Sequence, residues 1–203
     1  MANLITLATY KTAEGIQSTK DDAKLELLID SVSQLVKTYC NNSFVDYYNT
    51  DKIEYFNISY NTTFIQLSEC PLRLQYDSNG GNGDGAIVPT VSERTQFGSE
   101  YTLLSNDTDY YIDTDLDAIY RIGTAWPTGP GSVKVQYKAG YSTVPADLKL
   151  AVIDLVTYYH KDEHKARQTI AGASIQNQGS TSQRNNVAFP DHIKRVLDLH
   201  KNY

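Results

Sequence analysis

Cysteine is scarce in this chain of 203 residues, which holds only Cys40 and Cys70. A single bridge could not hold a chain of this length together, so a disulfide framework is excluded. The apolar runs are far shorter than the ~18 residues that a membrane span needs. Residues 1–15 also lack the basic start and apolar core of a secretory signal. We therefore expect no association with a membrane.

Positive charge is also in the minority, with 18 Lys and Arg against 24 Asp and Glu and a net charge of -6. This balance argues against a general electrostatic attraction to DNA or to an anionic membrane. The segment 160–203 is basic, whereas 100–118 contains six acidic residues and no basic one. Tyr is abundant, with 16 residues against one Trp. Tyr is enriched both in β-strands and at protein interfaces, and composition alone does not distinguish these two explanations.

The segment Ser18–Cys40 has the pattern of an amphipathic helix, with Thr19 as the expected N-cap and Asn41 after its end. Its apolar residues recur at steps of three and four and form one face. These residues are Leu25, Leu28, Ile29, Val32, Leu35, Val36 and Tyr39.

From Phe44 to Tyr141 the pattern changes towards a period of two, which indicates a β-rich region. The alternation is clearest over Ser132–Lys138, where apolar and polar residues take turns. A turn at Ser59–Thr62 is expected to connect the first two strands. The other expected strands are Lys52–Phe56, Thr63–Leu67, Tyr101–Leu104, Asp109–Ile112 and Ala118–Ile122.

Two further helices are expected, opened by Pro145 and Pro190, because proline suits the first helical position. The segment 168–188 between them consists mainly of Gln, Asn, Ser, Thr and Gly, which predicts a flexible polar loop. The predicted fold class is α+β, a small helical bundle with a β-rich insertion between its first and second helices. We assign residues 1–44 and 138–203 to the helical domain and 45–137 to the insertion.

Motifs for catalysis or metal binding are weak. His160–His164 matches the H-x-x-E-H pattern of a zinc-peptidase class, but that class needs a downstream Glu and none follows Glu163. Asp113, Asp115 and Asp117 have the spacing of a calcium loop, but Ala and Thr occupy the positions where Gly and Glu are needed. A weak cation site in this acidic turn stays open as an alternative. We assign no catalytic, cofactor-binding or metal-binding residue and no cofactor, and we predict a protein that is not an enzyme.

The segment 133–159 resembles the signature of tailed-bacteriophage head–tail connector proteins, also called adaptors. In that family a strand ends in an Ala-Gly-Tyr turn, and a Val-Pro-x-Asp-Leu-Lys segment then starts a helix. The residues that match are Ala139, Gly140, Tyr141, Val144, Pro145, Asp147 and Leu148. The segments 39–44 and 189–197 resemble the end of the family's opening helix and its closing helix. The long β-rich section departs from the compact members and is similar to the longer subgroup with a β insertion.

The resemblance implies a structural protein of the virion, made in the host cytoplasm and located at the head–tail junction. It implies a ring, typically of twelve copies, that lies beneath the portal protein, extends the DNA channel and contacts a stopper or tail protein. DNA would pass through without sequence-specific binding. The C-terminal segment of relatives commonly docks on the portal, so we expect deletion of residues 190–203 to abolish portal binding while the rest stays folded. The implied portal-binding residues are Phe189, Ile193, Lys194, Arg195, Val196, Leu197 and Tyr203.

Three alternatives to the adaptor stay open, and one of them is a free-standing ligand-binding β module. The chain could be a different neck or tail component, such as a stopper or a tail-completion protein. A metal-dependent hydrolase that uses His160, Glu163 and His164 is the weakest alternative.

Overall fold

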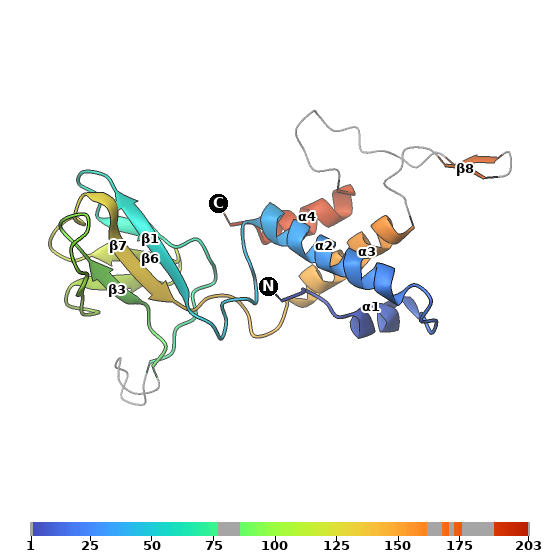
Figure 1. Ribbon diagram of the computed structural model, residues 1–203, viewed down its shortest axis with the longest axis horizontal. Helices are drawn as coiled ribbons and strands as arrows, with labels where there is room; N and C mark the ends of the chain where they lie inside the picture. Colours follow the sequence, from blue (N-terminus) through green and yellow to red (C-terminus); the bar gives the residue numbers. More distant parts are fainter. Residues whose placement is uncertain (1, 77–85, 162–167, 171–172, 176–188, 203) are drawn as a thin grey trace. The chain divides into compact units, whose positions relative to one another are not determined.

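The computed structural model describes residues 2–76, 86–161, 168–170, 173–175 and 189–202 (Figure 1). The chain divides into two compact units. The helical unit comprises Met1–Asn42 and Thr143–Tyr203, and the β-rich unit comprises Ser43–Ser142. Helices near both ends and strands in the middle confirm the predicted α+β class.

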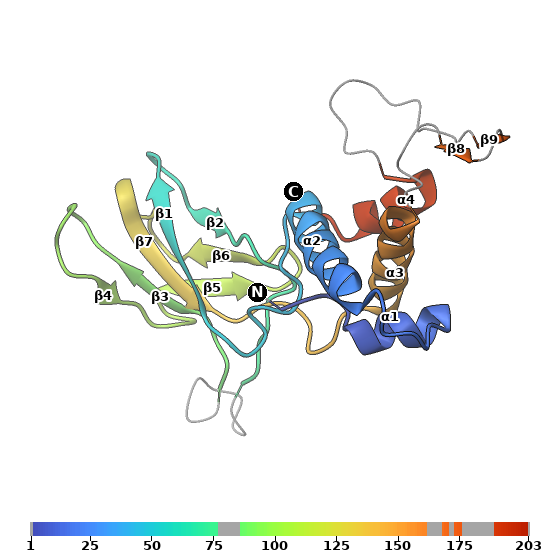
Figure 2. The ribbon, with the colours of Figure 1, turned by 45° about the vertical axis from the view of Figure 1, so that its right-hand side comes forward.

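The helical unit is built on α2, which contacts α1, α3 and α4, while α3 also contacts α4 (Figure 2). The bounds of these helices are α1 Leu7–Glu14, α2 Asp22–Cys40, α3 Ala146–His160 and α4 Asp191–Leu199. Helix α2 buries residues of the predicted stripe, among them Leu25, Ile29, Val32 and Val36. The core of this unit therefore follows from the helical periodicity of its sequence.

The starts of the helices differ slightly from the prediction. Helix α2 begins at Asp22 after Asp21, not after Thr19, and no side chain caps it. Pro145 and Pro190 occupy the N-cap positions of α3 and α4, one residue before the predicted place. Both prolines have extended ψ angles, 144° and 139°, and therefore lie just outside the helices that they precede.

The β-rich unit contains two antiparallel sheets. One has the strand order β1-β7-β3-β4 and the other has the order β2-β6-β5. Strand β7 is central to the first sheet because it pairs with both β1 and β3. The strands are β1 Lys52–Ile58, β2 Phe64–Gln66, β3 Thr90–Glu93, β4 Thr102–Leu103, β5 Tyr110–Asp113, β6 Ala118–Arg121 and β7 Gly129–Tyr137.

The two sheets share one apolar core. Val91, Val133 and Val135 of the first sheet and Ile65 and Ile119 of the second are buried in the same cluster. An ion pair of 3.1 Å also links Arg121 of β6 to Glu93 of β3. The sheets therefore pack face to face, as in a β-sandwich, and each has one outer face.

Several local predictions were wrong. The predicted turn between β1 and β2 is present at residues 60–61, but the two strands do not form a hairpin because they belong to different sheets. Helix α1 and strand β3 were missed, since α1 is short and buries only Tyr10, and β3 has four residues. Within the predicted polar loop, β8 Gln168–Ile170 pairs with β9 Ala173–Ile175, where β-branched residues favour strands. The rest of that loop, 176–188, lies outside the described residues.

Candidate functional site

The chain enters and leaves the β-rich unit at neighbouring points, and Gly140 lies at this place. Gly140 has a φ angle of 94°, a left-handed conformation that favours glycine. A Cβ atom built on it would lie 2.2 Å from the carbonyl oxygen of Phe44. The next residue, Tyr141, donates its backbone N–H to the same oxygen at 2.7 Å. The close approach of two segments that are far apart in sequence therefore requires glycine at the middle position of the Ala-Gly-Tyr turn.

Further backbone hydrogen bonds hold the same place together. Ala139 donates its N–H to the carbonyl of Tyr47 at 3.1 Å, and Gly140 donates to Pro71 at 2.8 Å. Glu69 accepts hydrogen bonds from both the backbone N–H and the hydroxyl of Ser43, at 2.8 and 2.7 Å. The first and last segments of the β-rich unit are thus tied to one another and to the segment around Pro71.

A largely buried polar network of Lys52, Glu54, Glu69 and Tyr137 lies next to the contact between Ser43 and Glu69. The Lys52 ammonium forms ion pairs with Glu54 at 3.0 Å and Glu69 at 3.2 Å. The Tyr137 hydroxyl donates to Glu54 at 2.9 Å and accepts from the backbone N–H of Glu69 at 3.2 Å. Each group has partners of opposite charge or complementary hydrogen bonding, so the network acts as an internal clamp between β1, β7 and the 68–70 segment.

The pKa shifts in this network have opposing causes. Burial alone raises the pKa of Glu54, but hydrogen bonds from Ser68, Lys52 and Tyr137 outweigh it and leave this pKa below its usual value. Burial alone lowers the pKa of Lys52, but Glu54 and Glu69 outweigh it and raise this pKa. Both groups are therefore held in their charged forms at neutral pH, which suits a structural ion pair better than a proton donor or acceptor.

The remaining signature residues belong to the helical unit. Leu148 is fully buried in α3, and Val144 and Pro145 are half-buried before it. Asp147, in the first turn of α3, lies 2.8 Å from the ring nitrogen of His200 at the end of α4. Hydrogen bonding to His200 is the main reason that the pKa of Asp147 is lowered. This part of the signature starts α3 and connects it to α4.

Helix α4 is held firmly against the end of α2. The rings of Tyr39 and Phe189 meet edge to face, with centroids 5.0 Å apart. The Tyr39 hydroxyl donates to Asp198 at 2.6 Å, and the backbone N–H of Asn202 donates to the carbonyl of Cys40 at 2.8 Å. The C-terminal helix is therefore an integral part of the helical unit.

The predicted portal-binding residues divide into two sets. Phe189, Ile193 and Leu197 are buried inside the helical unit, where they pack α4 onto its neighbours. Arg195 is exposed, and Lys194 and Val196 are half-buried. Tyr203 lies outside the described residues. The portal-binding role stays a prediction, and the surface that could serve it consists of Lys194, Arg195 and Val196.

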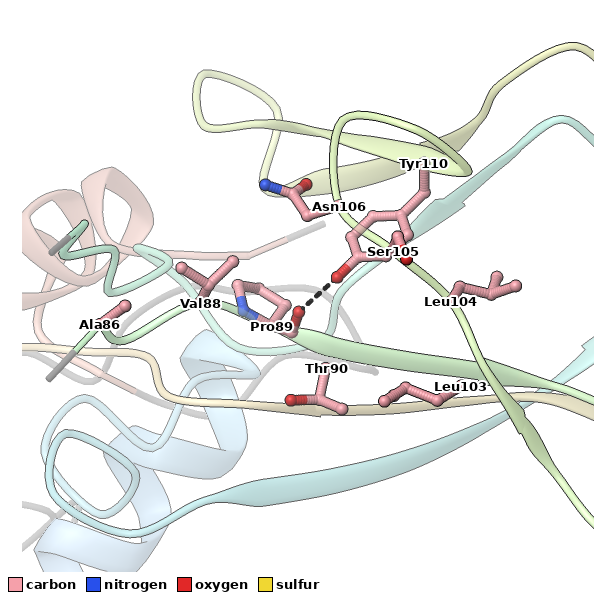
Figure 3. Close-up of a pocket in the computed structure, with 9 residues that line it drawn as sticks. All are labelled: Ala86, Val88, Pro89, Thr90, Leu103, Leu104, Ser105, Asn106 and Tyr110. Atoms are coloured by element: carbon pink, nitrogen blue, oxygen red, sulfur yellow. Dashed lines mark hydrogen bonds between the residues drawn. The ribbon is translucent and has the colours of Figure 1, made fainter. Parts of the chain in front are cut away.

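A pocket of about 400 Å³ opens in the β-rich unit beside β3 and the start of β5 (Figure 3). The Tyr110 hydroxyl points across it and donates to the carbonyl of Pro89 at 2.8 Å. Burial raises the pKa of Tyr110 to about 12, so this hydroxyl stays protonated at neutral pH. Tyr110 is the one titratable side chain among the described residues that line the pocket, which therefore offers no acid–base pair.

The sequence motifs for metal binding find no support in the described part of the chain. Asp113 accepts backbone N–H bonds from Asp115 and Leu116, and Asp117 accepts one from Leu72, so these carboxylates organise turns. No group of three metal-ligating side chains occurs among the residues that the structure describes. Glu163 and His164 lie outside those residues. None of the described helices is both long and apolar enough to cross a membrane.

The Lys52–Glu54–Glu69 network escaped the sequence analysis. Lys52 and Glu54 alternate with apolar residues along β1, where charged residues ordinarily indicate a solvent-facing side. The half-buried pattern of these two residues places them inward, whereas Ile53 and Tyr55 point outward. Alternation alone does not show that Tyr55 faces the solvent and the half-buried Glu54 faces inward, since a period of two leaves the choice of face open.

This chain is similar to known proteins in sequence and in fold. A family model described as head completion protein matches residues 3–73 and 87–203. The head completion protein of Escherichia phage T5 is 20% identical over 199 residues, which cover 98% of both chains. A chain in the neck of an empty gene transfer agent particle, with C6 symmetry, has a TM-score of 0.59 at 12% identity and covers 98% of this chain and 90% of its own. A chain in the neck of the native particle, with C12 symmetry, has a TM-score of 0.55 at 14% identity, covering 100% and 96%.

The structural similarities support the fold, and the family match extends over both units and far more than half of the chain. The resemblance to head–tail connector proteins is confirmed at the level of the family. This chain belongs to the head completion protein family, and it is a structural protein of the phage virion.

Proposed function

We propose that this chain is a head–tail adaptor: a ring of copies beneath the portal that extends the DNA channel and connects the capsid to the tail. The observation that carries the proposal is that the family match covers both the helical and the β-rich unit. The similarity to chains of a particle neck with C6 or C12 symmetry supports a ring. The helical unit serves as the connector domain, and the β-rich unit is its insertion.

The charge of the chain suits a channel component. A protein that neutralises many phosphates binds DNA with salt-dependent affinity, which would retard DNA that must move past it. The net charge of -6 lowers this attraction. The adaptor therefore guides DNA without sequence-specific binding, and it acts by assembly without an enzymatic step.

Contact with the portal is proposed for the three predicted residues of α4 that are not buried in the helical unit. Lys194, Arg195 and Val196 combine two positive charges with an apolar side chain on this short helix. The buried residues Ile193 and Leu197 hold the helix in place, so they support the contact without making it. Such a surface would fit an acidic, partly apolar patch on the portal protein.

Purified particles that carry the tagged full-length chain test the main proposal by electron microscopy of the neck. We expect a closed ring directly below the portal. A ring on the tail side of another neck protein would favour the stopper or tail-completion alternative. Absence of the chain from purified virions would refute both.

Charge reversal tests the portal contact better than truncation does. Deletion of residues 190–203 would remove Ile193 and Leu197 from the core, so the expectation that the remainder stays folded no longer holds. In the variant Lys194→Glu/Arg195→Glu we expect a loss of portal binding with an unchanged helical CD spectrum. The matched control is Lys20→Glu/Lys24→Glu, which makes the same charge change at exposed positions in and next to α2. Equal portal binding by the two variants would contradict the proposed contact.

A further inference from the structure

The large exposed apolar side chains are concentrated in the β-rich unit. Of the thirteen among the described residues, ten belong to this unit and three to the helical unit. Five of the ten lie on strands, on the outer faces of the two sheets: Ile53, Tyr55, Phe64, Leu103 and Tyr111. Exposed aromatic and aliphatic groups of this kind, arranged on a defined surface, mark sites of protein contact.

The outer face of the first sheet is aromatic and basic. Strand register places Tyr55, Lys134, Ser92 and Leu103 in one row across β1, β7, β3 and β4. Tyr55 and Leu103 are 60% and 66% exposed. Tyr101 lies beside this row, with its ring 6.2 Å from that of Tyr55 and 6.0 Å from the Lys134 ammonium. We call Tyr55, Tyr101, Leu103 and Lys134 the basic face.

Arg94 strengthens the positive character of this face. Its guanidinium lies 4.9 Å from the ring of Phe97 and 4.9 Å from that of Tyr101. Cation–π contacts of this kind hold the charge in a fixed position instead of leaving it on a mobile side chain. The positive charge is therefore built into the surface.

The outer face of the second sheet is aromatic and acidic. Register places Phe64, Tyr120 and Tyr111 in one row across β2, β6 and β5. Their rings stack on one another, at 5.5 Å between Phe64 and Tyr120 and 4.9 Å between Tyr120 and Tyr111. Asp113 follows Tyr111 on the same face, and Asp115 is exposed in the adjoining turn. We call Phe64, Tyr111, Tyr120, Asp113 and Asp115 the acidic face.

The ring geometry of the acidic face argues against a flat stacking platform. The three rings are nearly parallel to each other, with interplanar angles of 27° and 14°. Their faces are therefore mostly occupied by one another. A nucleobase or a sugar needs an open ring face, and the acidic residues would repel a phosphate backbone. A protein surface that carries positive charge fits better.

The two faces are oriented away from each other, because the sheets pack on one core and each turns its other side outward. One molecule cannot bring them together, but two neighbouring copies can. Contact between two different surfaces of the same chain is heterologous, and its repetition generates a ring when the rotation between neighbouring copies closes. We propose that the basic face of one copy binds the acidic face of the next copy. This inference rests on the proposed ring and names the surfaces that join its subunits.

Cross-linking in purified particles tests this pairing directly. A full-length chain with Lys134→Cys and Asp115→Cys is incorporated and treated with a short bis-maleimide. We expect a ladder of dimers, trimers and larger products on a denaturing gel, while each single variant gives no more than the unaltered chain. Background is low because Cys40 is buried, which raises the pKa of its thiol to about 12, and Cys70 is half-buried.

The outcomes separate the inference from the proposed function. Absence of the unaltered chain from particles would refute the proposed function, whereas incorporation of the double-cysteine variant without a ladder would refute only the pairing. Dimers from one single variant alone would show a symmetric contact and would also overturn it. Retention of the chain on immobilised duplex DNA, lost in Lys134→Glu and without a ladder in particles, would assign the basic face to DNA.

Charge exchange gives a second readout if the cysteine variants are not incorporated. We expect Lys134→Glu and Asp115→Lys each to lower incorporation into particles, and their combination to restore it. Lys24→Glu on α2 is the matched control, since it makes the same change at an exposed position of the helical unit. Failure of the combination to exceed both single variants would contradict the proposed pairing.

Discussion

Replacement of Gly140 by alanine tests the physical role of the signature turn. The new Cβ atom would lie 2.2 Å from the Phe44 carbonyl oxygen, well under the 3.0 Å that real Cβ contacts essentially never breach. The two atoms nearest to this Cβ are the carbonyl oxygen and carbonyl carbon of Phe44, which belong to the backbone, so no flexible side chain can move aside. Relief of the clash has to separate Phe44 from Gly140, which also stretches the 2.7 Å hydrogen bond from Tyr141.

The expected cost has two parts. A non-glycine residue at a left-handed φ costs roughly 1–2 kcal/mol. Loss of a backbone hydrogen bond and its geometry adds about 1–3 kcal/mol. Gly98→Ala is a matched control, because Gly98 has a φ angle of 88° and nothing within 4 Å of its ideal Cβ position. The control therefore carries the first part only.

Urea unfolding followed by the fluorescence of Trp126 measures this difference. Trp126 is the single tryptophan and is buried in the β-rich unit, so its signal reports on that unit. We expect Gly140→Ala to lower the free energy of unfolding by about 2–5 kcal/mol, against about 1–2 kcal/mol for Gly98→Ala. Equal losses in the two variants would refute the argument that close approach of Phe44 requires glycine here.

Two further predictions concern helix α4 and the buried network. Ile193→Ala should lower the free energy of unfolding of the helical unit by about 2–5 kcal/mol, measured by far-UV CD, whereas Leu199→Ala, at 81% exposure, should change it by less than about 0.5 kcal/mol. Because the pKa of Glu54 is lowered in the folded state, its contribution is present above the unfolded value of about 4.3 and is lost as the pH falls below it. The urea midpoint reported by Trp126 should therefore fall less between about pH 6 and about pH 3 in Glu54→Gln than in the unaltered chain.

Much of the fold follows from short-range pattern. The apolar stripe of α2 and the alternation of β7 correctly predict buried residues, such as Val36 and Val135. They do so because side chains return to the same face about every 3.6 residues in a helix and every second residue in a strand. Which strands pair with one another is harder to predict from the sequence. The segments Lys52–Phe56 and Thr63–Leu67 are correct as strands, yet their assignment to different sheets depends on distant partners, β7 and β6.

The candidate interaction sites show the same division. The sequence places Phe189, Ile193 and Leu197 on one side of a helix, but it does not say whether that side meets the portal or the protein's own core. An amphipathic helix is compatible with either contact, with a partner or with its own core, until its neighbours are known. The contact between Tyr39 and Phe189 joins residues far apart along the chain, and single-sequence patterns carry no information about such pairs.

The position of Gly140 also explains how a β-rich unit can be accommodated between two helices. A domain can be inserted with little disturbance when its first and last residues are neighbours, because the host then needs to bridge only a short gap. Here the hydrogen bond from Tyr141 to Phe44 brings the two ends of the insertion together, and Glu69 fixes Ser43 beside them. The turn thus closes the β-rich unit at its base, and the faces of its two sheets can vary without a change in the chain path at Phe44 and Tyr141.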